Sequence, residues 1–114
     1  MSTIEFYRGE TAKFHFHRED KNGFTILPLP SEMTFSVKKK GFESQLGYCF
    51  RKTLQDMKVD RLTGEYSFTI DPTDTEKMDS GKIYTYDLEV VDKGVRTVIA
   101  QGQFLLKTSN FSSR

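Results

Sequence analysis

Apolar and polar residues alternate along most of this chain. The clearest case is the segment "TAKFHFHR" (11–18), in which Ala12, Phe14 and Phe16 alternate with polar residues. Successive side chains of a β-strand point to opposite faces of its sheet, so a period of two predicts a strand with one buried face. Three further segments repeat the pattern, with inward positions at Met33, Phe35 and Val37; at Tyr66, Phe68 and Ile70; and at Tyr84, Tyr86, Leu88 and Val90.

The segments between the alternating runs carry turn signals. Asn22-Gly23 predicts a tight turn, because both residue types tolerate positive φ. Pro28 and Pro30 predict an extended connection outside any central strand, since proline cannot donate a ladder hydrogen bond. The segment "YCFRKTL" (48–54) is the expected strand after the one that contains Phe35.

The last two strands are predicted to form a hairpin. "DKG" (92–94) reads as a short turn in which Gly94 can adopt the left-handed conformation. The segment "VRTVIAQGQFLLK" (95–107) then returns along the preceding strand. Its alternation changes phase near Gln101-Gly102, which predicts a β-bulge at that point.

The polar segment "DPTDTEKMDSG" (71–81) predicts one helical turn in a crossover between strands. Asp71 suits the N-cap and Pro72 the first helical position, where its missing N–H costs nothing. Asp74 and Glu76 are expected near the positive end of the helix dipole. Gly81 is expected to end the turn.

Two residues around the end of this crossover are expected to be structural. Met78 is predicted to pack inward. Tyr84, at the start of the next strand, resembles the tyrosine corner of immunoglobulin-like sandwiches, in which the hydroxyl group bonds back to the preceding loop.

These elements predict an all-β fold. We expect an immunoglobulin-like antiparallel β-sandwich of about seven strands, with one short helical turn near 72–79 and a single domain over residues 1–114. No helix-period segment supplies the crossover helices that a parallel α/β sheet would need. Ten Phe and five Tyr fit the half-buried surface of a sheet.

Charge and composition exclude several classes of function. Lys+Arg total 17 and Asp+Glu total 16, so no global field would attract nucleic acid or an anionic membrane. The N-terminus has no apolar signal-peptide region, and no apolar run approaches the roughly 18 residues of a membrane span. We therefore expect synthesis in a bacterial cytoplasm without secretion by a signal peptide.

The candidate chemical groups have simpler structural explanations. His15 and His17 share one strand face at a spacing that can bind a metal, but no third ligand is evident. Cys49 lies between Tyr48 and Phe50 in an expected strand, where a buried or half-buried, inert thiol is favoured over a nucleophile. The carboxylates of 71–79 match no calcium loop, and capping accounts for them. We expect no enzyme activity and no cofactor.

Four blocks of the sequence resemble a known family: "FYRGETAKFHFHREDKNG", "MTFSVKKK", "FRKTL" and "GEYSFTIDPTDTEKMDSGKIYTYDLEVVDKG". Together they resemble the immunoglobulin-like N-terminal domain of upper baseplate proteins of Gram-positive phages, and small prophage relatives. The segment "GKIYTYD" is one residue longer than the spacing usual in that family. These motifs are turns and core positions, so they specify a fold better than a task.

The resemblance implies a non-enzymatic structural or adaptor protein of a phage or prophage particle, in its tail or baseplate. Its partners would be other phage structural proteins and further copies of itself, without nucleic acid or membrane. Phe42, Leu46 and Tyr48 are the candidate interaction residues, because the segment 40–50 reads as a long loop with apolar side chains. The alternative is a carbohydrate-binding sandwich module at a bacterial cell surface, which the absence of Trp disfavours.

Overall fold

The structure, a computed structural model, describes residues 3–39, 48–79 and 81–107. These residues form eight strands, one 3₁₀ turn and one short helix. The elements are β1 (Ile4–Tyr7), β2 (Ala12–His17), β3 (Glu32–Lys39), β4 (Phe50–Thr53), η1 (Leu54–Asp56), β5 (Lys58–Asp60), β6 (Glu65–Ile70), α1 (Pro72–Thr75), β7 (Ile83–Asp92) and β8 (Val95–Lys107).

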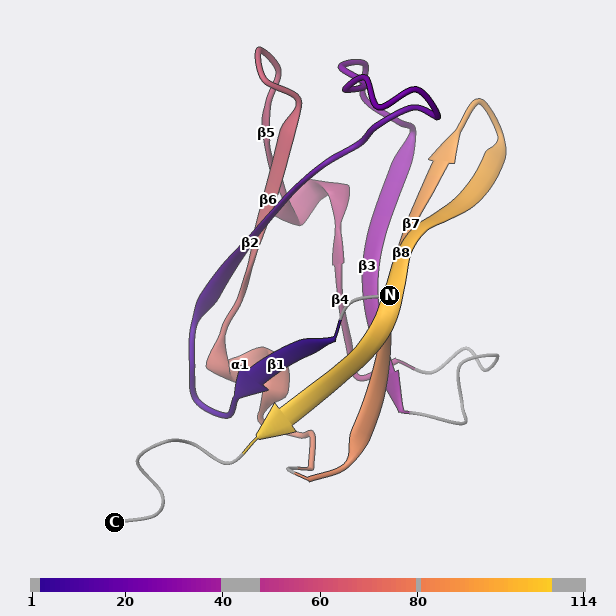
Figure 1. Ribbon diagram of the computed structural model, residues 1–114. Coiled ribbons are helices and arrows are strands. Elements are labelled where there is room, and N and C mark those ends of the chain that lie inside the picture. Colours follow the sequence, from indigo (N-terminus) through magenta and orange to yellow (C-terminus); the bar gives the residue numbers. More distant parts are fainter. Residues whose placement is uncertain (1–2, 40–47, 80, 108–114) are drawn as a thin grey trace.

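The strands make two facing sheets (Figure 1). One sheet has five strands in the order β1-β8-β7-β3-β4, and the other has three in the order β2-β6-β5. All pairings are antiparallel except β1 with β8, which run parallel. The all-β sandwich prediction is confirmed, and the strand order β8-β7-β3-β4 over β2-β6-β5 corresponds to G-F-C-C′ over B-E-D of an immunoglobulin-like sandwich. The short strands β1 and β5 were not predicted as strands.

The core lies between the sheets and is built from the alternating residues. The predicted inward positions of β3, β6 and β7 are all buried, and those of β2 pack against the same core. Phe35 of one sheet and Phe68 of the other meet with ring centroids 4.8 Å apart. Each such large side chain contributes about 1.5–3 kcal/mol when it is fully buried.

The β7–β8 hairpin confirms one prediction and corrects another. Lys93 and Gly94 both have positive φ, 52° and 79°, as a two-residue hairpin turn of the type I′ class requires. The β-bulge, however, is not at Gln101-Gly102. It lies earlier in β8, where Leu88 pairs with Ala100 and Glu89 with Val98, so Ile99 is the extra residue. From Ala100 to Leu105 the pairing of β8 with β7 is regular. Gly102 takes an ordinary inward position opposite Tyr86 and needs no bulge.

The helical turn α1 joins β6 in one sheet to β7 in the other. Asp71 is its N-cap, and the Asp71 N–H donates to Asp74 Oδ2 at 2.9 Å. Lys52 Nζ of β4 lies 2.8 Å from the same oxygen and ties the turn to the five-stranded sheet. The hydrogen bond from the Thr73 hydroxyl is the main cause that lowers the pKa of Asp71. Glu76 is at the C-terminal cap, so its predicted place near the positive end of the dipole is wrong.

Arg8 holds the other end of this turn. Its guanidinium donates to the carbonyl oxygens of Thr75, at 3.3 Å, and of Glu76, at 3.1 Å, and also to that of Met78. The last carbonyls of a helical turn have no partner inside the turn, so a cation is favourable there. Met78 itself is buried, as predicted.

Of two buried tyrosines, Tyr84 has a hydrogen-bonded hydroxyl group and, within the described part of the chain, Tyr66 does not. The Tyr84 hydroxyl accepts a hydrogen bond of 2.8 Å from the Asp79 backbone N–H, which is the bond that the tyrosine-corner prediction required. The Tyr66 ring stacks on Phe16, with ring centroids 5.2 Å apart. Among the described residues its buried hydroxyl has no hydrogen-bond partner.

The substitutions Tyr84→Phe and Tyr66→Phe should therefore affect stability differently. Tyr84→Phe should lower the free energy of unfolding by about 1–2 kcal/mol, because it leaves the Asp79 N–H unpaired. Tyr66→Phe removes a buried hydroxyl that gains nothing, and should leave stability unchanged or raise it by about 1 kcal/mol. Urea unfolding of both variants measures the difference, and equal losses would contradict the assigned hydrogen bonds.

Candidate docking surface

One end of the sandwich is formed by three connections that lie close together. They are the 18–31 segment between β2 and β3, the 61–64 turn between β5 and β6, and the Lys93-Gly94 turn between β7 and β8 (Figure 1). We call this end the open end. The crossover with α1 lies at the opposite end.

Exposed apolar side chains concentrate at the open end. In the described part of the chain, Tyr48 and Ile83 are the large exposed hydrophobic residues located elsewhere. The others are all on the three connections or the first residues of β8: Phe24, Leu27, Leu29, Leu62, Val95, Val98 and Ile99. Single exposed apolar residues are ordinary, but a group of them at one end of a small domain is typical of a binding surface.

Phe24 is presented by a hydrogen-bonded turn. Asp20 Oδ1 accepts from the backbone N–H of Asn22 at 2.8 Å and of Phe24 at 3.0 Å. The Asp20 N–H in turn donates to the Phe24 carbonyl at 2.9 Å, and Gly23 has a φ of 85°. The turn predicted at Asn22-Gly23 is confirmed, with positive φ at the glycine alone of the two. Phe24 is 70% exposed on this fixed turn, so binding a partner through it would cost little ordering entropy.

The segment after Phe24 lies against the 61–64 turn. A Cβ atom added to Gly64 would come 2.5 Å from Thr25 Cγ2 and 3.0 Å from Leu27 Cδ2. Ile26, between these two residues, faces the β7–β8 hairpin instead. The segment 24–27 therefore joins the apolar residues of both neighbouring connections into one surface.

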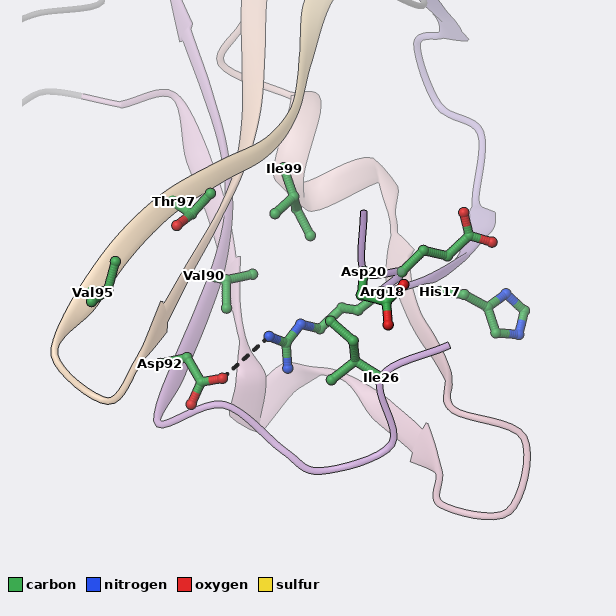
Figure 2. A pocket seen from close by; sticks show the side chains of 10 residues that line it. His17, Arg18, Asp20, Ile26, Val90, Asp92, Val95, Thr97 and Ile99 are labelled. Carbon is green, nitrogen blue, oxygen red and sulfur yellow. Dashed lines mark hydrogen bonds and ion pairs between the residues drawn. The ribbon is translucent and has the colours of Figure 1, made fainter. Parts of the chain in front are cut away.

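A cleft of about 560 Å³ opens between this segment and the β7–β8 hairpin. Ile26, Val90, Val95 and Ile99 supply its apolar lining (Figure 2). Arg18 lies inside it, and only 8% of its side chain is exposed. Its guanidinium contacts Asp92 Oδ2 at 3.5 Å and donates to the Pro28 carbonyl at 3.2 Å, so it bridges the ends of the two sheets.

Arg18 was missed by the sequence analysis, although the signal was present. Ala12, Phe14 and Phe16 take the inward positions of β2, and residue 18 is the next position with the same parity. An arginine at that place is expected to extend inward with its charged group at the end of the core. His17, with the opposite parity, points away from the ion pair (Figure 2).

The candidate metal-ligating side chains are not grouped into a metal site among the described residues. His15 and His17 are exposed on the outer face of the three-stranded sheet, as predicted, and His15 Nδ1 lies 3.3 Å from Glu65 Oε1. No three His, Cys, Asp or Glu side chains within 3–39, 48–79 and 81–107 are grouped to hold a metal ion. The crossover carboxylates Asp74 and Asp79 pair with Lys52 and Lys82.

Cys49 differs from its prediction. It lies just before β4 rather than inside a strand, and it is exposed rather than buried or half-buried. Partial screening of the thiol from water nevertheless raises the pKa of Cys49, and the Lys39 charge only partly offsets this effect. The thiol is therefore the protonated, less nucleophilic form at neutral pH.

The three predicted interaction residues are only partly described. Phe42 and Leu46 lie outside the described residues. Tyr48 is exposed, and the Arg51 guanidinium carbon lies 4.7 Å from the centre of its ring. Its role in an interaction stays a prediction, and the exposed apolar residues at the open end were not predicted.

No family model matches the chain, and no curated protein matches it. Among the described residues, no helix has the length and apolar character needed to cross a membrane.

The substitution Gly64→Ala should disturb the open end. Its φ of 75° strains any residue with a side chain, by about 1–3 kcal/mol, and the new methyl group would also collide with Thr25. Gly94→Ala is the matched control, because φ is 79° there and nothing lies within 4 Å of the added atom. Gly64→Ala should cost more in urea unfolding and should shift the amide resonances of 24–27. Equal costs without such shifts would contradict the contact.

The Cys49 thiol should react slowly with iodoacetamide at neutral pH. Since the thiolate is the reactive form, the rate should still be rising at pH 9, the thiol having its pKa raised from 9.0. Mass spectrometry of the labelled chain measures the rate, with Cys49→Ser as the unlabelled control. A rate that levels off near neutral pH would reveal an activated thiol instead.

Proposed function

We propose that this chain is a non-enzymatic structural or adaptor protein of a phage or prophage particle, in its tail or baseplate. It acts by protein–protein docking through the open end. The observation that carries the docking role is the gathering of exposed apolar side chains there, on connections that hydrogen bonds and close packing hold in place.

Phe24 is the best candidate for the central anchor of this surface. Binding energy at protein interfaces is concentrated in a few large side chains surrounded by residues that exclude water. Phe24 provides such a side chain on a fixed turn, with Leu27 and Leu29 following it and Leu62 on the adjoining connection. The cleft between Ile26 and the β7–β8 hairpin, with apolar walls and Arg18 inside it, offers space for a side chain of the partner.

The phage assignment is supported by the sequence resemblance. Its blocks contain the residues that fix the crossover end, among them Arg8, Asp71 and Tyr84. They also contain Asp20 and Gly23, which shape the turn that presents Phe24. A sandwich with its ends fixed in this way is suited to a repeated assembly, in which each copy must present the same surface.

Phage particles induced from the cell that carries the gene test this proposal. Quantitative mass spectrometry of purified particles should find the chain at a copy number that fits threefold or sixfold symmetry. Absence of the chain from intact, infectious particles would overturn the virion role. Retention of a cell-wall saccharide by the purified chain would instead favour the carbohydrate-binding alternative.

The variant Phe24→Ser tests the docking surface itself. Losing a central anchor costs about 2 kcal/mol, or about 30-fold in affinity, so the variant should be depleted from particles while folding normally. Ile83→Ser is the matched control, because Ile83 is also exposed but lies outside the open end. Full incorporation of the Phe24 variant would show that docking uses another surface.

A further inference from the structure

The strand β8 has an open edge over much of its length. β1 pairs only with residues 104–107 of β8, from Ile4 opposite Phe104 to Tyr7 opposite Lys107. The described chain places no strand along the same edge at residues 95–103, whose other edge is paired with β7. At about 3.4 Å per residue, this stretch exposes roughly 30 Å of unpaired backbone.

This edge has little of the usual protection against strand pairing. Proteins block exposed edges with charges, prolines, very short strands or β-bulges. The β-bulge here, at Ile99, leaves regularly paired strand on both sides of it. The other outer strands follow this rule: β1, β4 and β5 are only three or four residues long, and β2 carries the exposed Lys13. Residues 95–103, "VRTVIAQGQ", contain one charged residue and no proline. That residue, Arg96, is paired with Glu89 on its own sheet.

We propose that two copies of this chain associate by antiparallel pairing of their β8 edges. The pairing would join the two five-stranded sheets into one continuous sheet across a twofold axis. The proposal rests on the docking role above and names a second copy as one partner. It also accounts for Val95, which is 64% exposed because no neighbouring strand covers it.

The bulge at Ile99 selects the register of this pairing. The inward positions of β8 are Val95 and Thr97 before the bulge and Ala100 and Gly102 after it, since these pair with the inward positions of β7. A twofold axis between Val98 and Ile99 keeps inward residues opposite inward residues. Val95 then faces Gly102 of the second copy, and Thr97 faces Ala100 of the second copy.

This register is complementary in both size and charge. Each larger inward side chain meets a smaller one, and on the outer face Arg96 meets Gln101 of the second copy, so no like charges are opposed. β1 of the second copy begins opposite its own Phe104, just beyond the end of the eight-residue overlap. It would lie past the Lys93-Gly94 turn and would not compete for the same edge.

A charge-swap experiment tests the pairing on the purified, full chain. The variant T97K/A100K opposes lysines across the axis, and T97E/A100E opposes glutamates, so each alone should be monomeric in light scattering and sedimentation. An equimolar mixture opposes lysine and glutamate and should recover the dimer of the unchanged chain. The variant T11K/Q55K adds two lysines at exposed positions away from this edge and outside the open end, and should remain dimeric.

The outcomes separate cleanly. A wild-type chain that is monomeric at millimolar concentration overturns the pairing but leaves the virion role standing, because particle composition is measured separately. A dimer that persists in both charged variants also overturns it, since another surface must then be used. If a charged variant fails to fold, hydrogen exchange of the unchanged chain decides: amides of 95–102 must gain protection as concentration rises.

Discussion

The contact between Phe35 and Phe68 joins the two sheets, and the rest of the fold depends on this aromatic layer. Phe35 also lies 5.6 Å from Tyr86 and 6.3 Å from Phe50, while Phe68 lies 5.6 Å from Phe14, measured between ring centroids. Strands from both sheets must present their aromatic face to this layer at once. A slip of one residue in any of them would turn that face to water, so the layer fixes the registers of the strands that contribute to it.

The extent of the aromatic layer explains why the open end has a cleft and exposed apolar residues. Toward that end, the inward positions of β8 become small, at Gly102, Ala100 and Thr97, so this strand sends no aromatic ring across the gap. Arg18 fills part of the space, with Asp92 and the Pro28 carbonyl as its partners. The ion pair between Arg18 and Asp92 is weak, because the two groups are 3.5 Å apart and the carboxylate is half exposed. The main effect of Arg18 is therefore to occupy space at this end of the core. Core depletion thus produces both the cleft and the exposed apolar rim.

The sequence pattern predicted those features that depend only on neighbouring residues along the chain. The inward faces of β2, β3, β6 and β7 follow from period-two alternation, and the turn at Gly94 follows from the ease with which glycine adopts positive φ. The position of the bulge at Ile99 could not be predicted in this way, because it depends on which residues of β7 lie opposite. Alternation within β8 alone suggested Gln101-Gly102 instead. Exposure of Phe24 was equally hidden, since a phenylalanine after a turn is more often buried. The place of Arg18 could have been predicted, had the parity of β2 been continued by one step.

The division of the sandwich into two ends also explains why the sequence predicts the fold but not the binding partner. The residues that carry the family resemblance close the crossover end, through Arg8, Asp71 and Tyr84, or shape turns, through Asp20 and Gly23. The side chains displayed by those turns, above all Phe24, are free of any constraint from the core. Substitution there changes the surface offered to a partner while the aromatic layer and the crossover remain intact. Sequence motifs therefore indicate the fold. The identity of the partner depends on exposed residues that the fold does not restrict.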